Sequence, residues 1–348
     1  MPLDVPPAIV GVLSFLIGVG LVIGSVETFI EAVAESALAL GVSGFFLTVL
    51  LAGTDLENAV LGFVAVLDGL PGLALGTVFG EALFVLGAAV GVAGVLTPFE
   101  TDAPRSYLLM MLGAPALLLV LALDGTLTRF DGVLLTVGYL PLLVAVYGLE
   151  RRANTRYLSA EEVEAFEEQA LDGGTEAADD DLLDLDLDLD IRWLDDLRAR
   201  HEGRYRLGVA LLAVGGMTVG SELAVSGAQV MLGVLGITGL AFGATVMSFV
   251  ASLEELFLTV EPVRRGRPHL GVGNVVGSTL FFVTANAGVI ALVRPIDTGG
   301  AVLAVHWPFF LVSLALVAGM LARGRVSRVG GATLLAVYAA YWGANLVT

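Results

Sequence analysis

Two short clusters of oxygen-bearing side chains stand inside long apolar runs of this chain. The first reads GTDLEN over residues 53–58, and the second reads VASLEE over residues 250–255. Acidic groups in hydrocarbon are costly and therefore indicate a function. Carboxylates, hydroxyls and carbonyls are the ligands that hard cations such as Ca²⁺ prefer. The candidate cation ligands in the two clusters are Thr54, Asp55, Glu57, Asn58, Ser252, Glu254 and Glu255.

The second cluster repeats the first. A shift of 197 residues places Leu56 on Leu253 and Glu57 on Glu254. About twenty residues after each cluster comes a glycine-rich segment, in which Glu81 follows Gly80 in one copy and Ser278 follows Gly277 in the other. Small residues let helices approach closely, so Glu81 and Ser278 join the candidate ligands. Two such segments, one in each half of an apolar chain, are typical of a secondary transporter built from internal repeats.

Helical spacing predicts which of these groups act together. Asp55 and Asn58 are three residues apart, as are Ser252 and Glu255. Each pair therefore shares one face of a helix. Glu57 and its counterpart in the second copy lie about 100° around the helix from that face.

The composition predicts an all-α integral membrane protein. Of the 348 residues 57% are hydrophobic, and the mean hydropathy is +0.89. At about 20 residues per span we expect ten transmembrane helices, in two halves of five. Within 25–67 either two helices or one helix with a break near Gly41 or Gly53 fits, and a total of nine is the alternative. The expected spans are 7–24, 27–42 (or a fused 27–67), 72–97, 107–124, 130–149, 204–234, 237–262, 270–293, 304–322 and 329–347.

Arginine placement predicts the orientation, because cytoplasmic loops are enriched in Lys and Arg. With the N-terminus outside, 15 of the 17 arginines fall in cytoplasmic loops, and only Arg129 and Arg294 do not. This topology makes the two repeats inverted with respect to each other, in a multi-pass protein of the cell membrane.

The halves are divided by an acidic segment, which carries much of the net charge of −18. We expect an N-terminal membrane half at 1–150 with its repeat at about 27–97, and a C-terminal half at 204–348 with its repeat at about 220–293. Residues 151–203 are expected to be a solvated cytoplasmic linker.

The sequence gives no support for other classes of functional site. The chain has no cysteine, which excludes disulfides and thiolate metal sites. It shows no nucleophile–base pair, phosphate loop or metalloprotease signature. We therefore expect no enzyme activity, no cofactor and no nucleic-acid partner; the expected partners are inorganic cations and the lipid bilayer.

The repeats resemble those of the calcium/cation antiporter superfamily, which includes sodium/calcium exchangers. In that family each repeat carries G-T-S-L-P-E, followed by G-N-x-x-G-S-N, and the second copy here reads GNVVGS over residues 273–278. The resemblance covers about 240 residues in both halves. It implies ten helices, transport of Ca²⁺ with Na⁺ or H⁺, and an ion site where the two repeats face each other at mid-membrane, with Glu255 as the central ligand.

Several positions depart from the family pattern. The ligand glutamate of the first repeat falls on Asn58, and the later polar positions fall on Val85 and Phe282. Glu57 and Glu254 replace the family's proline, and they occupy the position of the glutamate in the G-N-A-x-E motif of the proton-coupled branch. Buried carboxyl groups can carry protons. Exchange of Ca²⁺ or another cation for protons is therefore an alternative, and a non-transporting scaffold or sensor is another.

Overall fold

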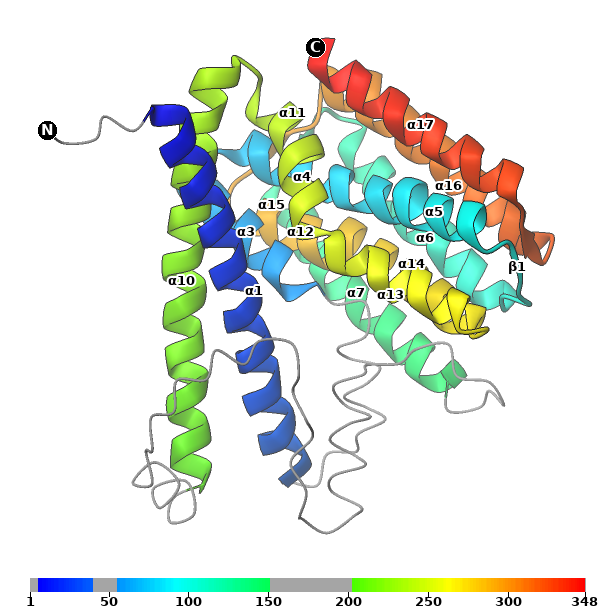
Figure 1. Ribbon diagram of the computed structural model, residues 1–348, viewed down its shortest axis with the longest axis horizontal. Helices are drawn as coiled ribbons and strands as arrows, with labels where there is room; N and C mark the ends of the chain where they lie inside the picture. Colours follow the sequence, from blue (N-terminus) through cyan, green and yellow to red (C-terminus); the bar gives the residue numbers. More distant parts are fainter. Residues whose placement is uncertain (1–5, 40–54, 151–201, 348) are drawn as a thin grey trace, which may run out of the picture.

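The computed structural model describes residues 6–39, 55–150 and 202–347, and helices dominate these segments (Figure 1). Local signals explain several helix starts: Asp55 caps one helix, and Pro71 and Pro268 stand in the first turn of two others, where proline costs no hydrogen bond. The helices of the first half are α1 (Pro7–Ala39), α3 (Leu56–Leu67), α4 (Pro71–Leu83), α5 (Val90–Leu96), α6 (Arg105–Ala122) and α7 (Arg129–Glu150). Those of the second half are α10 (Glu202–Leu235), α11 (Gly239–Phe242), α12 (Ser248–Ala251), α13 (Leu253–Arg264), α14 (Pro268–Phe281), α15 (Ala287–Val293), α16 (Trp307–Ala322) and α17 (Arg328–Val347).

Four π-helical segments interrupt this pattern. They are η1 (Phe84–Ala89), η2 (Gly243–Met247), η3 (Phe282–Asn286) and η4 (Val302–His306). Two of them continue α4 into α5 and α14 into α15 as single rods, which span Pro71–Leu96 and Pro268–Val293. Turns of this kind are rare and often lie at functional sites.

Among the described residues, seven helices are long and apolar enough to cross a membrane. An eighth candidate is the pair Gly239–Ala251 and Leu253–Arg264, which is bent by 50° at its break. Helices α3 and α17 fall outside this group, and residues 40–54 are not described, so the count of ten stays a prediction. The expected break near Gly41 or Gly53 also lies outside the described residues.

One expected boundary was wrong. Spans at 7–24 and 27–42 were expected to be separate, but α1 runs without interruption from Pro7 to Ala39. No proline lies between its ends, and its glycines serve packing or face open space. Gly18 packs on the backbone of Ala224, whereas Gly20 and Gly24 have no atom within 4 Å of a would-be Cβ.

The internal repeat is visible in the order of the elements. Helix α3 begins 197 residues before α13, at Leu56 and Leu253, and both helices have 12 residues. Strands β1 (Phe99–Glu100) and β3 (Ile296–Asp297) occupy matching places. The two halves of the fold are therefore copies of one structural unit.

Two short strand pairs join the halves. Strand β1 pairs antiparallel with β4 (Arg325–Val326), and β2 (Thr126–Leu127) pairs antiparallel with β3. Each pair thus combines a loop of the first half with a loop of the second. The pairs lie at the ends of helices, where backbone groups would otherwise lack partners.

Helices α1 and α10 form a long pair beside the rest of the bundle (Figure 1). They run antiparallel, since Gly11 contacts Val230 whereas Gly216 contacts Ser25. Glycines allow their backbones to touch: a Cβ at Gly227 would lie 2.5 Å from the backbone nitrogen of Phe15. Close backbone approach of this kind drives helix association in lipid.

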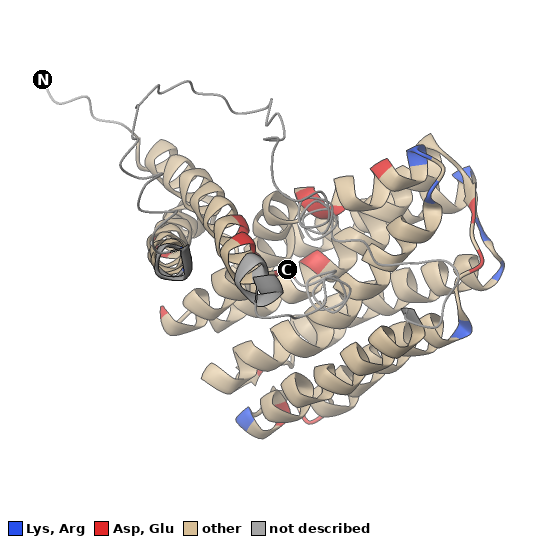
Figure 2. Cartoon of the chain, turned by 90° about the horizontal axis from the view of Figure 1, so that it is seen from below, with Lys and Arg blue, Asp and Glu red and all other residues tan. Residues whose placement is uncertain are grey.

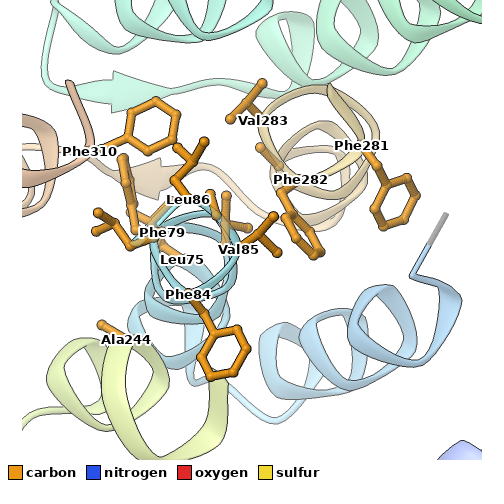
Figure 3. Close-up of a cluster of buried hydrophobic side chains, with 14 of the residues drawn as sticks. Leu75, Phe79, Phe84, Val85, Leu86, Ala244, Phe281, Phe282, Val283 and Phe310 are labelled. Atoms are coloured by element: carbon orange, nitrogen blue, oxygen red, sulfur yellow. The ribbon is translucent and has the colours of Figure 1, made fainter. Parts of the chain in front are cut away.

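The rod of α4, η1 and α5 lies at the centre of the apolar core. Phe79, Phe84 and Val85 of this rod are buried. Phe79 packs against Phe310 of α16, and Val85 lies beside Phe282 of η3 (Figure 3). Phe84 points the other way and packs against Phe249 of α12 and Tyr338 of α17. Gly76 allows the rod to contact the other half directly, because a Cβ there would lie 2.3 Å from the carbonyl oxygen of Leu240. The close helix approach predicted for the glycine-rich segment is confirmed at this position.

Candidate functional site

The second repeat breaks its helix at Ser252. This residue ends α12 and precedes α13, with φ −95° and ψ 15°, and its side chain forms no cap hydrogen bond. The break places Glu255 in the first turn of α13, where the positive end of the helix dipole favours a negative charge. Glu255 is buried at 5% exposure.

Two donors from α14 hold the Glu255 carboxylate. Asn274 Nδ2 donates to Glu255 Oε2 at 2.6 Å, and Ser278 Oγ donates to the same oxygen at 2.9 Å. Asn274 Nδ2 also donates to Thr259 Oγ1 at 3.3 Å. These hydrogen bonds join the two motif segments of the second repeat, VASLEE over residues 250–255 and GNVVGS over residues 273–278, in one unit.

The first repeat places its polar cluster at the start of α3. Asp55 is the N-cap, and its Oδ1 accepts from the backbone N–H of Asn58 at 3.0 Å. The Asn58 side-chain amide donates to the other oxygen of Asp55. Both side chains are buried. The prediction that Asp55 and Asn58 lie together is confirmed by this direct contact.

Glu81 reaches across to the second half of the chain. It lies on α4 with no exposed surface, and Asn286 Nδ2 of η3 donates to its Oε2 at 3.4 Å. Sequence reasoning missed Asn286, although a lone amide in an apolar span was a usable signal. Glu81 therefore has a partner from the opposite repeat.

These groups lie close together at the interface of the two repeats. The carboxylates of Asp55, Glu81 and Glu255 interact electrostatically with one another. Four buried oxygens near the helix breaks have no hydrogen-bond partner: Asn58 Oδ1, Glu81 Oε1, Ser252 Oγ and Asn286 Oδ1. Buried polar atoms normally find partners, so oxygens left open beside carboxylates fit a cation.

The acids alone do not form a metal cluster. In the described part of the chain, no three His, Cys, Asp or Glu side chains converge on a point that could hold a metal ion. Glu261, which lies outside this group, forms ion pairs with Arg264 and Arg265. A cation here would therefore need amide and hydroxyl oxygens in addition to the carboxylates.

Glu57 and Glu254 border this group: Glu57 interacts electrostatically with Asp55 and Glu81, and Glu254 interacts with Glu255. The two side chains interact electrostatically with each other, and Glu57 is buried whereas Glu254 is exposed. Glu27 of α1 interacts electrostatically with Glu254. Thr54, the remaining candidate ligand, lies outside the described residues.

The later polar positions of the family pattern belong to the apolar core in this chain. Val85 and Phe282 have no exposed surface, and they face each other across two rods (Figure 3). Charged groups follow a different distribution: acidic residues also lie within helices, whereas arginines gather at helix ends (Figure 2). The acids in the interior are thus separated from the basic residues of the described segments.

The relatives of this chain include an inner membrane protein, a putative antiporter and a sodium/calcium exchanger. The chain is 26% identical to the inner membrane protein YrbG of Escherichia coli over 284 residues, which cover 80% of this chain and 79% of that protein. It is 25% identical to the putative antiporter CaxA of Alkalimonas amylolytica, covering 96% and 98%. It is 23% identical to the sodium/calcium exchanger MaX1 of Methanosarcina acetivorans, covering 95% and 97%.

A solved structure shares the fold. The sodium-calcium exchanger NCX_Mj, soaked with Na⁺ and Sr²⁺, superimposes with a TM-score of 0.53 at 20% identity, covering 96% of this chain and 97% of the other. The sodium/calcium exchanger protein family matches residues 10–148 and 205–347, which include both repeats. The chain is therefore a multi-pass membrane protein that belongs to the sodium/calcium exchanger family.

Proposed function

We propose that this protein is a secondary active antiporter that exchanges Ca²⁺ for Na⁺ across the cell membrane. Membership of the family supports a cation antiporter. The observation that carries the finer proposal is the Glu255 carboxylate, which two donors orient while the Asp55 carboxylate lies within electrostatic range. Two carboxylates provide the charge that neutralises one divalent cation.

The transported cations are substrates of this site. Glu255, Asp55, Ser252 and Ser278 would supply carboxylate and hydroxyl oxygens for Ca²⁺. The helix break at Ser252 and the start of α3 at Asp55 place these oxygens inside the bundle, and broken helices of this kind form the ion sites of transporters. We infer alternating access, in which the site opens to one side of the membrane at a time.

The strand pairs support the proposed orientation, with the N-terminus outside. Strands β1 and β4 lie beside Arg105 and Arg323, in loops assigned to the cytoplasm. Strands β2 and β3 lie beside Arg129 and Arg294, the two arginines assigned to the outside. Each pair therefore joins loops of the same predicted side. Residues 151–203 would then form an acidic linker in the cytoplasm between the membrane halves 1–150 and 204–348.

The contact between Glu57 and Glu254 favours a second candidate, exchange of Ca²⁺ or another cation for protons. Two carboxyl groups held close together are more stable when they share a proton than when both are charged. Glu254 is exposed and Glu57 is buried. In this candidate the pair would carry the exchanged proton.

Uptake into proteoliposomes tests both candidates. Radiolabelled Ca²⁺ would be added outside vesicles loaded with Na⁺, and in parallel outside vesicles with an outward H⁺ gradient, at high ionic strength. We expect uptake with the Na⁺ gradient. Uptake with the H⁺ gradient alone would replace the first candidate by the second, and Glu57→Gln should then abolish it. If neither gradient drives uptake of Ca²⁺ or another divalent cation, a non-transporting scaffold becomes the better explanation.

A further inference from the structure

A groove lies between α16 and α17, outside the candidate ion site. Its volume is about 400 Å³, within the range of small-molecule sites. Its lining includes Pro308 and Val312 on α16 and Thr333, Ala336 and Ala340 on α17. The Thr333 hydroxyl donates to the backbone carbonyl oxygen of its own helix at Val329. These five residues therefore offer a ligand apolar contacts.

The groove opens toward the bilayer. The span that contains α16, Val302–Ala322, is long and apolar enough to cross a membrane. Pro308 and Val312 of this span are exposed, and so are Ala336 and Ala340 on the opposite wall. Alanines leave a recess where larger side chains would fill the space between the two helices. A ligand that enters from the hydrocarbon can therefore lie along α17.

Arg323 lies at one end of the groove. It follows Val312 by eleven residues, or about three helical turns, so both lie on one face of α16. Gly319 lies on that face between them, and Arg323 Nη1 donates to its carbonyl oxygen at 3.1 Å. A Cβ on Gly319 would lie 3.3 Å from this nitrogen, so the guanidinium is folded back along the helix toward the groove. A guanidinium has five N–H donors, and this bond uses one of them.

The loops at this end of the groove carry excess positive charge. Strands β1 and β4 bring two loops together there. The loops contain two acids, Glu100 and Asp102, and four arginines, Arg105, Arg323, Arg325 and Arg328. All four arginines are exposed. Basic pockets between transmembrane helices bind the anionic headgroups of lipids.

The groove lies at the depth of an acyl chain whose phosphate is among these arginines. Thr333 and Ala340 follow Arg328 by five and twelve residues on α17, which places them about 8 and 18 Å further along the helix axis. Half of the hydrocarbon core of a bilayer measures about 15 Å. One chain of a phospholipid therefore reaches from the arginines along the groove to the middle of the membrane.

A second copy of this chain fits the groove less well. A two-fold dimer brings the same surface of both copies together. Contact through this groove would therefore place the arginines of one copy beside those of the other, and like charges in an interface are unfavourable. A lipid phosphate would neutralise the same arginines.

We propose that the groove between α16 and α17 binds an anionic diacyl phospholipid, with one acyl chain along Ala336 and Ala340 and the phosphate on Arg323. The site is separate from the carboxylates of the ion site. It does not depend on the exchange function proposed above.

Native mass spectrometry of the purified full-length protein tests the site. The delipidated protein is titrated in detergent with phosphatidylglycerol, which is anionic, or with phosphatidylcholine that carries the same acyl chains. We expect one phosphatidylglycerol to bind with an affinity at least about tenfold higher than that of phosphatidylcholine, because each arginine near an anionic headgroup contributes a factor of about five.

Arg323→Gln removes the charge beside the groove. We expect it to lower the affinity for phosphatidylglycerol about fivefold and to leave that for phosphatidylcholine within about twofold. Arg267→Gln is the matched control, because Arg267 is also exposed but lies in the turn between α13 and α14. It should leave both affinities unchanged.

Ala336→Phe fills the groove. We expect this variant to lose binding of both lipids, because the acyl chain is excluded. Ala339→Phe adds the same side chain at an exposed position of α17 that does not line the groove, and it should bind both lipids as the original protein does. An unchanged elution profile in detergent confirms that the variants fold.

Equal affinities of the original protein for the two lipids would overturn the proposal, as would unchanged binding of phosphatidylglycerol by Ala336→Phe. A dimer that Ala336→Phe dissociates would show instead that a second copy occupies the groove. If Ala336→Phe does not fold, Arg323→Gln carries the test, and an unchanged preference for phosphatidylglycerol in that variant overturns the proposal.

Discussion

The two repeats place acids at the starts of the corresponding helices α3 and α13 but stabilise them differently. In the second repeat, Glu255 receives hydrogen bonds from Asn274 and Ser278 on a neighbouring helix. In the first repeat, Asp55 is bonded within its own helix by Asn58, and Glu81 receives one long contact from the other repeat. One half is thus oriented before any cation arrives, whereas the other retains open oxygens that a cation can satisfy.

Removing the oriented acid should have the largest effect. We expect Glu255→Gln to abolish exchange, with a loss of at least about 100-fold, because the loss of a ligand exceeds that of an outer partner. The amide keeps the shape of the side chain, so the protein should fold. Ca²⁺ uptake into proteoliposomes measures the loss, and an unchanged elution profile in detergent confirms folding. Normal uptake by this variant would show that the ion site lies elsewhere.

Removing one of the donors should give the next largest effect. Asn274→Ala leaves Glu255 without its 2.6 Å hydrogen bond. We expect Ca²⁺ affinity to fall about 10–100-fold, as for other partners that orient a metal ligand. Thr259→Val is the control, because Thr259 contacts Asn274 but not the carboxylate in the described hydrogen bonds. Equal losses in the two variants would argue that packing, and not orientation of Glu255, is responsible.

The contact between the halves should be sensitive to volume. A Cβ at Gly76 would lie 2.3 Å from the Leu240 carbonyl oxygen, whereas the nearest atom to a Cβ at Gly72 would lie at 3.6 Å. We expect Gly76→Ala to lower stability by about 1–3 kcal/mol through overpacking. Gly72→Ala on the same helix should be close to neutral. The melting temperatures of the two variants in detergent measure the difference. Similar melting temperatures would show that the rod does not pack tightly against the second half at Gly76.

The smallest expected effect concerns stability without cations. Glu81→Ser makes the first repeat resemble the second, and it removes a buried carboxylate that has an open oxygen. We expect stability in cation-free buffer to rise by about 1 kcal/mol, from the relieved desolvation of that group. The increase in melting temperature on adding Na⁺ should shrink, since fewer ligands remain. A lower melting temperature in cation-free buffer would mean that the Asn286 contact is worth more than the cost of the buried acid.

The sequence by itself determined the class of this protein and the location of its two functional segments. The 57% hydrophobic composition requires a bilayer, because only lipid can cover so much apolar surface. The repetition of acidic clusters located the starts of α3 and α13, and the spacing of Asp55 and Asn58 predicted a contact that the structure shows. Local signals such as an N-cap and helical spacing act over a few residues and can be read from the chain.

Tertiary structure decided which groups meet across the repeats. The pairing of Glu81 with Asn286 joins residues 205 positions apart, and no spacing rule reaches that far. The π-helical segment that carries Asn286 also has no sequence signature of its own. The continuity of α1 was missed for a related reason: an apolar run does not reveal whether a glycine ends a helix or packs against another one, as Gly18 does against Ala224. These outcomes depend on which helices come into contact, and only the assembled bundle fixes that.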